Sequence, residues 1–146
     1  MELVKEIKEG LNKLEELISS DPIKDVVKLN EERYGLTFNP EKAIEKLEEE
    51  LQEFKDAVKN NDIHEMIDAL TDLRVIAIGE IRKAGYDPKC TLKETVKEIS
   101  SRRQDPEQAK RWANGEKEDG EKWLKDKSQD KSELYKADYK NCIIKG

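Results

Sequence analysis

Four acidic residues stand in two pairs near the middle of this 146-residue chain. Glu50 and Glu53 are three residues apart, and Glu65 and Asp68 repeat that spacing. Because residues three apart share one face of a helix, two helices brought together would gather all four carboxylates into one nest. Oxygen-only ligands suit a hard divalent cation, so the spacing predicts a Mg²⁺ site, in which Mn²⁺ is expected to substitute.

Acidic residues at helical spacing are also typical of a solvated face, and 42% of this chain is charged. Asp62 and Glu65 additionally fit a capping box, in which the two residues satisfy each other's amides. Two features favour the metal interpretation. The run 75–78 makes the second motif helix apolar nearly all round, and the acidic stripe through Asp68 and Asp72 leads into that run. Carboxylates drawn into a buried stripe need a paired charge or a metal.

The carboxylates must be positioned by helices. Asn39-Pro40 is an N-cap with a first-turn proline, and the break 60–62 separates one motif helix from the next, which Gly85 ends. Thr91 and Glu94 fit a second capping box. In chain order, helices are predicted over residues 3–18, 22–34, 40–59, 63–84, 91–102 and 106–114.

Apolar residues recur at helical spacing and predict which faces are covered. In the first, third and fifth helices the stripes are Leu3, Ile7, Leu11, Leu14 and Ile18; Ala43, Leu47, Leu51, Phe54 and Val58; and Leu92, Val96 and Ile99. No stretch alternates like a strand. We therefore expect an all-α fold, with an antiparallel helical bundle over 1–104 and a less regular C-terminal arm over 105–146. The arm is expected to pack on the bundle or on a neighbouring subunit.

Composition excludes several classes of function. The net charge is −6 and no basic block is present, so we expect no nucleic-acid partner. The longest apolar run is too short to span a membrane and the N-terminus has no apolar leader, which predicts a cytoplasmic protein without a membrane partner. Cys90 and Cys142 lack metal-ligand spacing, so zinc is not expected. A reducing compartment would leave both as thiols, although they could pair if they met.

The pattern Glu49-Glu50-x-x-Glu53, followed by Glu65-x-x-Asp68, resembles the signature E-E-x-x-E … E-x-x-D of MazG-like nucleotide pyrophosphohydrolases. These belong to the all-α NTP pyrophosphatase group. The continuation 68–73, DALTDL, is similar to the second motif helix of that family, and the resemblance covers residues 41–103. The tail around Trp123, Lys125 and 135–142 is similar to that of small phage-type members.

The resemblance implies Mg²⁺-dependent hydrolysis of a (d)NTP to the monophosphate and pyrophosphate. It makes Glu50, Glu53, Glu65 and Asp68 the metal ligands, and Glu49 an accessory carboxylate that binds metal or orients the attacking water. These five residues are the catalytic candidates. Relatives often follow the fifth helix with an Asn and a Lys. Here the sequence 100–103 is SSRR, so the resemblance does not extend to recognition of the base.

Further side chains are candidates for contact with the substrate: Asp72, Arg102, Arg103, Trp123, Lys125 and Lys127. The cations could bind phosphate groups or be ordinary solvated charges. Trp123, like Trp112, could stack on a base or anchor the arm. His64 begins a helix, where a surface role is favoured over a role as a base.

Competing chemistries find little support. The chain has no phosphate-binding G-x-x-x-x-G-K-[ST] loop and no G-x-S-x-G, and a di-iron bundle would require Glu at position 61, which is Asn. The main alternative is a non-enzymatic acidic helical module that binds a partner. Because the helix from Ile63 is apolar on too many sides for one small bundle to cover, we also expect a homodimer or homotetramer.

Overall fold

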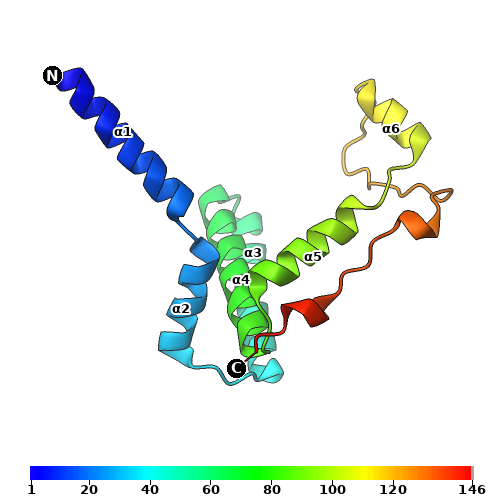
Figure 1. Cartoon of the computed structure of the whole chain (residues 1–146). Helices are drawn as coiled ribbons and strands as arrows, with labels where there is room; N and C mark the ends of the chain where they lie inside the picture. Colours follow the sequence, from blue (N-terminus) through cyan, green and yellow to red (C-terminus); the bar gives the residue numbers. More distant parts are fainter. Residues whose placement is uncertain (146) are drawn as a thin grey trace. The chain divides into compact units, whose positions relative to one another are not determined.

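The computed structural model describes residues 1–145, with the side chains of Ile18 and Ser19 excepted. Within this range the chain forms α-helices, short 3₁₀-helices and no strand, which confirms the all-α prediction (Figure 1). The helices are α1 (Glu2–Ser19), α2 (Pro22–Tyr34), α3 (Pro40–Lys59), α4 (Ile63–Lys83), α5 (Pro88–Ser100), α6 (Pro106–Ala113), η1 (Lys131–Glu133) and η2 (Tyr139–Cys142). No helix among the described residues is long and apolar enough to cross a membrane.

Local capping explains where α2, α3 and α4 begin. The side chains of Asp21, Asn39 and Asp62 each accept a hydrogen bond, at 3.2 Å, from the backbone amide three residues later. Such a cap stabilises a helix by about 1 kcal/mol. The predicted bounds of α2 and α3 are confirmed, and the predicted start of α4 is confirmed as well.

The predicted start of α5 is wrong. The helix begins at Pro88, and the side chain of Asp87 caps it by accepting from the amide of Lys89 at 3.0 Å. Asp-Pro supplies both an acceptor and a residue with the φ angle of a first helical turn, so the helix starts before the predicted capping box. Thr91 lies inside the helix, where its hydroxyl donates to the carbonyl of Pro88 at 3.1 Å.

The chain divides into two compact units, Met1–Ala84 and Gly85–Gly146. In the first unit α3 and α4 pack as an antiparallel hairpin, and α2 contacts α4. The predicted bundle extended to residue 104, whereas the structure groups α5 with the C-terminal arm. The carboxylate motif thus lies in a unit built by α1 to α4.

Alanines form the contact surface of the hairpin. Ala43 and Ala57 of α3 and Ala69 of α4 are buried, and such small side chains let the two helices approach closely. The predicted core position Ala43 is confirmed, but Leu51 and Val58 are 43% and 51% exposed. Leu47 and Phe54 are half-buried, so the larger apolar side chains of the predicted stripe are covered only in part.

Two other predicted apolar stripes are exposed. On α1, Leu3, Ile7, Leu11 and Leu14 are all more than half exposed, and Ile18 lies outside the described side chains. On α5 the predicted inner face of Leu92, Val96 and Ile99 is 54%, 51% and 57% exposed. The covered face of α5 is instead the one that carries Glu94, which is 7% exposed and bonded to the arm.

The second unit is ordered by polar side chains that bond to distant backbone groups. Gln108 of α6 is 2% exposed; its amide nitrogen donates to the carbonyl of Lys122 and its amide oxygen accepts from the amide of Leu124, both at 2.7 Å. Glu121 accepts from the indole of Trp112 at 3.0 Å and pairs with Arg111. These bonds, with the indole first, hold the pKa of Glu121 down at about 2.

A buried glycine sets the approach of α2 to α4. A methyl group on Gly79 would lie 2.8 Å from Cγ of Asn30, which is closer than real contacts allow. The Asn30 amide is held by its bond to the carbonyl of Val26 at 2.9 Å. Only a residue without a side chain therefore fits this position while Asn30 stays where it is.

We expect Gly79→Ala to destabilise the protein by about 1 kcal/mol, because an overpacking cost of about 1–3 kcal/mol outweighs the gain in helix propensity of about 1 kcal/mol. Urea unfolding measures the difference. In an Asn30→Ala background the same substitution should be stabilising, because the clash is gone. If Gly79→Ala stabilises the protein with Asn30 intact, α2 does not pack on α4 as described.

Candidate metal centre

Three carboxylates converge on one side of the α3–α4 hairpin. Glu50 and Glu53 lie one turn apart on α3, and Asp72 reaches the same place from α4. One oxygen of each lies within 4.8 Å of the others, which would allow all three to contact one cation. Glu50 and Asp72 are half-buried, while Glu53 is exposed. The group is thus open to solvent on one side.

Glu50 is the member most withdrawn from water. Its Oε2 is shielded from solvent and accepts no hydrogen bond from any described donor. Burial, a side-chain hydrogen bond with Glu53 that favours the neutral acid, and the negative charges of Glu53, Asp72 and Glu49 raise the pKa of Glu50 from 4.5 to about 7. A half-buried carboxylate with an unpartnered oxygen among other carboxylates requires a proton or a cation.

Asp72 experiences the same crowding. Burial raises its pKa, and the charges of Asp68 and then Glu53 raise it further. Asp68 therefore adds its negative charge beside Asp72, one turn away on α4. Such a site is strongly attractive to a divalent cation, because each carboxylate destabilises the ionised form of its neighbours.

A family model for phosphoribosyl-ATP pyrophosphohydrolases, PRA-PH, matches residues 11–103, which is more than half of the chain. The chain belongs to the phosphoribosyl-ATP pyrophosphohydrolase family. This family is part of the MazG-like all-α NTP pyrophosphatase superfamily, so the resemblance found in the sequence is confirmed. It points to a pyrophosphohydrolase. No curated protein and no solved structure matches the chain significantly.

The hairpin of this family member brings together two of the four predicted ligands, Glu50 and Glu53. The third carboxylate is Asp72, which was predicted to contact the substrate. Asp68 is exposed, and its oxygens lie outside the group of converging ligand atoms. Glu65 is exposed at the start of α4 and also lies outside the group. Roles for Asp68 and Glu65 as ligands stay predictions.

Of the two hydrogen bonds in the capping box predicted for Asp62 and Glu65, the structure shows the one that Asp62 accepts. Asp62 caps α4 through the amide of Glu65, but the amide of Asp62 itself donates to the carbonyl of Ala57 at 2.9 Å. The reciprocal bond from the Glu65 side chain is therefore not required. Glu49 is exposed on α3, and its charge acts on the neighbouring Glu50.

The other predicted substrate contacts lie in the second unit. Arg102 pairs with Glu98 at 3.4 Å, and Arg103 with Glu133 at 3.3 Å and Asp126 at 3.8 Å. Lys125 and Lys127 are exposed, and Trp123 is 45% exposed. Trp112 anchors α6 through Glu121, as the anchoring alternative for the tryptophans expected. Contact of these residues with a substrate stays a prediction.

Glu50→Gln should make stability less dependent on pH. The pKa of Glu50 is about 7 in the folded protein, and its ordinary value is 4.5. In the pH window between these two values, the folded protein keeps a proton that the unfolded chain has lost, so the stability of the wild type falls as the pH rises through the window. The amide does not ionise. Above this pH window we expect the free energy of unfolding of Glu50→Gln to exceed that of the wild type by about 2 kcal/mol. Below the window this difference should vanish.

Urea unfolding in EDTA across this pH range measures the effect. Glu48→Gln is the matched control, because Glu48 is exposed on the same helix. Its difference from the wild type should not change with pH. A pH-independent difference for Glu50→Gln as well would mean that Glu50 is not buried among like charges.

Proposed function

We propose that this chain is a Mg²⁺-dependent nucleoside triphosphate pyrophosphohydrolase that converts a (d)NTP and water to the monophosphate and pyrophosphate. The observation that carries the proposal is the converging group of Glu50, Glu53 and Asp72, which lies within the segment that matches the family. Phosphoribosyl-ATP, named in the family description, is itself a nucleoside triphosphate. It is therefore a candidate substrate beside the common nucleotides.

The donor set suits Mg²⁺. All three converging groups are carboxylates, and Oε2 of Glu50 lacks a protein partner. Mg²⁺ prefers such oxygens and keeps several waters, which an open side of the site allows. Glu50, Glu53 and Asp72 would hold it, with Asp68 adding charge beside Asp72. Bound there, the ion would neutralise phosphate charge and lower the pKa of a coordinated water.

The residues of the chain supply positioning and proton transfer. Water attacks the phosphorus on one side of the oxygen that bridges the α- and β-phosphates. That P–O bond breaks, and pyrophosphate and the monophosphate separate. We assign Glu49, which is exposed beside Glu50, to orient the water and accept its proton. Positioning and charge neutralisation are the main requirements of phosphoryl transfer, so no covalent nucleophile is needed.

The reaction is tested with a panel of NTPs, dNTPs and phosphoribosyl-ATP, assayed separately for pyrophosphate and orthophosphate. We expect pyrophosphate release that depends on Mg²⁺ or Mn²⁺. Asp72→Asn and Glu53→Gln should each lower the rate by at least about 100-fold and remove most Mg²⁺ binding, because a metal ligand is lost. Without metal, either variant should be as stable as the wild type or slightly more stable, because repulsion is relieved.

Glu48→Gln is again the control and should keep full activity. Glu65→Gln separates two ligand sets. A larger loss from Glu65→Gln than from Asp72→Asn would favour the set implied by the sequence resemblance over the group seen in the structure. Absence of pyrophosphate release, together with a melting temperature unchanged by millimolar Mg²⁺, would favour the non-enzymatic module.

We also propose that a second copy of the chain covers the open face of the hairpin. On α3, exposed apolar side chains recur every seven residues, and α4 carries a matching set: Ile44, Leu51 and Val58, then Ile63, Ile67 and Leu70. At about 100° per residue, both sets lie on the side of the hairpin opposite Glu53 and Asp72. An isologous dimer would bury both stripes against their copies.

Sedimentation at micromolar concentration should show a dimer or a dimer of dimers. Leu51→Glu combined with Ile67→Glu should give monomers, because charges would be buried in the contact. Gln52→Glu adds a charge at an exposed position of α3 that lies about 100° from Leu51 and should leave assembly unchanged. A wild-type monomer would contradict the proposal.

A further inference from the structure

The C-terminal arm lies antiparallel along α5. The amide of Tyr135 donates to Oγ of Ser101 at 2.9 Å, at the end of the helix. Further along, the amides of Ala137 and Asp138 donate to the carboxylates of Glu98 and Glu94 at 3.1 and 3.3 Å. The arm thus follows α5 from its last turn back to its first.

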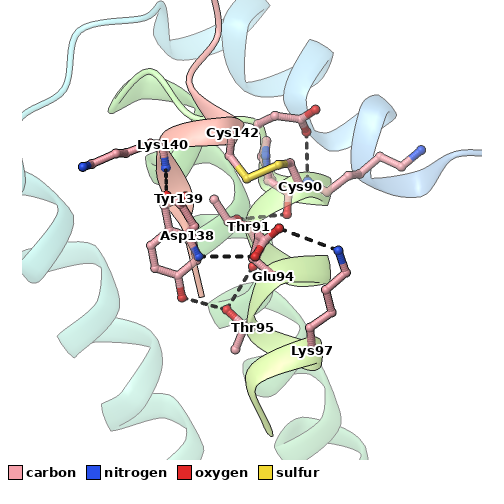
Figure 2. Close-up of a disulfide and its surroundings, with 12 residues drawn as sticks. Cys90, Thr91, Glu94, Thr95, Lys97, Asp138, Tyr139, Lys140 and Cys142 are labelled. Carbon is pink, nitrogen blue, oxygen red and sulfur yellow. Dashed lines mark hydrogen bonds and ion pairs between the residues drawn. A yellow bond between two sulfur atoms is a disulfide. The ribbon is translucent and has the colours of Figure 1, made fainter. Parts of the chain in front are cut away.

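A disulfide between Cys90 and Cys142 closes the far end of this arrangement (Figure 2). Their Cα atoms lie 5.4 Å apart, and Cys142 is 2% exposed. The sequence predicted two thiols in a reducing compartment and left pairing open; the structure pairs them. Since the two cysteines lie 52 positions apart in the sequence, the bond closes a loop that contains α6 and the arm as far as Cys142.

The middle of the arm has strong polar attachments of its own. Glu94 is buried and accepts from the hydroxyl of Tyr135 as well as from the arm backbone. These bonds, the tyrosine hydroxyl first, lower the pKa of Glu94, so the carboxylate remains ionised while it is covered. Gln129 bonds to the carbonyl of Ser101 and to the amide of Arg103, each at 2.8 Å.

The end of the arm packs on α5 through η2 and is held by a few bonds besides the disulfide. The amide of Asp87 donates to the carbonyl of Cys142 at 2.8 Å, and the amide of Ile144 donates to the carbonyl of Gly85 at 2.9 Å. The hydroxyls of Tyr139 and Thr95 are 2.8 Å apart. Tyr139, Ile143 and Ile144 are 42%, 49% and 38% exposed, so little apolar burial holds this segment. Segments with few buried apolar contacts open locally.

We propose that the Cys90–Cys142 disulfide is a redox-sensitive clasp, which on reduction by a dithiol releases residues 139–145 from the start of α5. A thiolate of the dithiol attacks one cysteine sulfur and the S–S bond breaks. The second thiol then displaces that sulfur. Cys90 and Cys142 become thiols, and the dithiol is oxidised to its disulfide. The attachments at Glu94, Glu98 and Ser101 keep the middle of the arm in place.

Release would change the surface at the start of α5. Cys142 would become an accessible thiol, and the Asp87 amide would lose its acceptor. In a reducing compartment disulfides are usually transient and sensing, whereas in an oxidising one they persist. The state of the clasp therefore depends on the redox conditions of the compartment: a reductant opens it and an oxidant closes it.

The test uses the wild-type protein, oxidised and then treated with millimolar dithiothreitol under native conditions. Alkylation and mass spectrometry count free thiols, and amide hydrogen exchange follows each segment. We expect two thiols after treatment and exchange at least about tenfold faster at Asp87 and 139–144. Exchange near Ser101 and 129–135 should stay unchanged. Cys90→Ser should show the fast pattern without dithiothreitol and no response to it.

Four results would overturn the proposal. The oxidised protein could already contain two thiols, which means that no disulfide forms. The bond could resist dithiothreitol until urea is added, which makes it a structural staple. Exchange could stay unchanged after reduction, which means that other contacts hold the end. Exchange could instead rise throughout residues 85–145, which means that the whole unit depends on the bond.

Discussion

Negative charge withdrawn from water has to be neutralised, and most features of the first unit depend on this constraint. Glu50, Glu53 and Asp72 repel one another, so the hairpin must be held together by other means. Alanine contacts, helix caps and the close approach of α2 at Gly79 supply this stabilisation. The proton that Glu50 holds near pH 7 relieves part of the repulsion. A divalent cation would relieve more of it, so the arrangement that weakens the metal-free fold is also the one that would bind metal.

Features encoded by neighbouring residues could be read from the sequence, and features that need long-range pairing could not. Asn39-Pro40 fixes the start of α3 locally, whereas two caps compete near α5 and the earlier one prevails. Glu50 and Glu53 are adjacent on one helix, but Asp72 joins them only through the pairing of α3 with α4. Pairing the residues of α3 and α4 outward from the break at 60–62 would have placed Glu53 of α3 opposite a residue near position 70 of α4. Glu65 is seven residues before Asp72, about 10 Å along the helix axis, which explains why the group leaves it out.

The C-terminal arm is ordered by interactions that a periodic sequence pattern does not reveal. Gln108 and Gln129 order it through bonds to backbone groups many residues away, and Glu121 does so through the indole of Trp112. Such bonds leave no repeat in the sequence, so the segment was predicted only as irregular. The pairing of Cys90 with Cys142 belongs to the same docking, because the Glu94 and Glu98 contacts hold the arm in the register that places Cys142 beside Cys90.

The two sides of the α3–α4 hairpin have opposite chemical character, and this division would link the proposed assembly to the proposed catalysis. One side carries the carboxylates and receives α2 at Gly79. The other exposes Leu51, Ile67 and their apolar neighbours, which a single copy leaves in water. Because α3 and α4 contribute to both sides, a partner that packs on the apolar side stiffens the helices that hold the carboxylates. Such a partner would leave the exposed oxygens of Glu53 uncovered, so the site would stay open to a phosphate group while its supports become rigid.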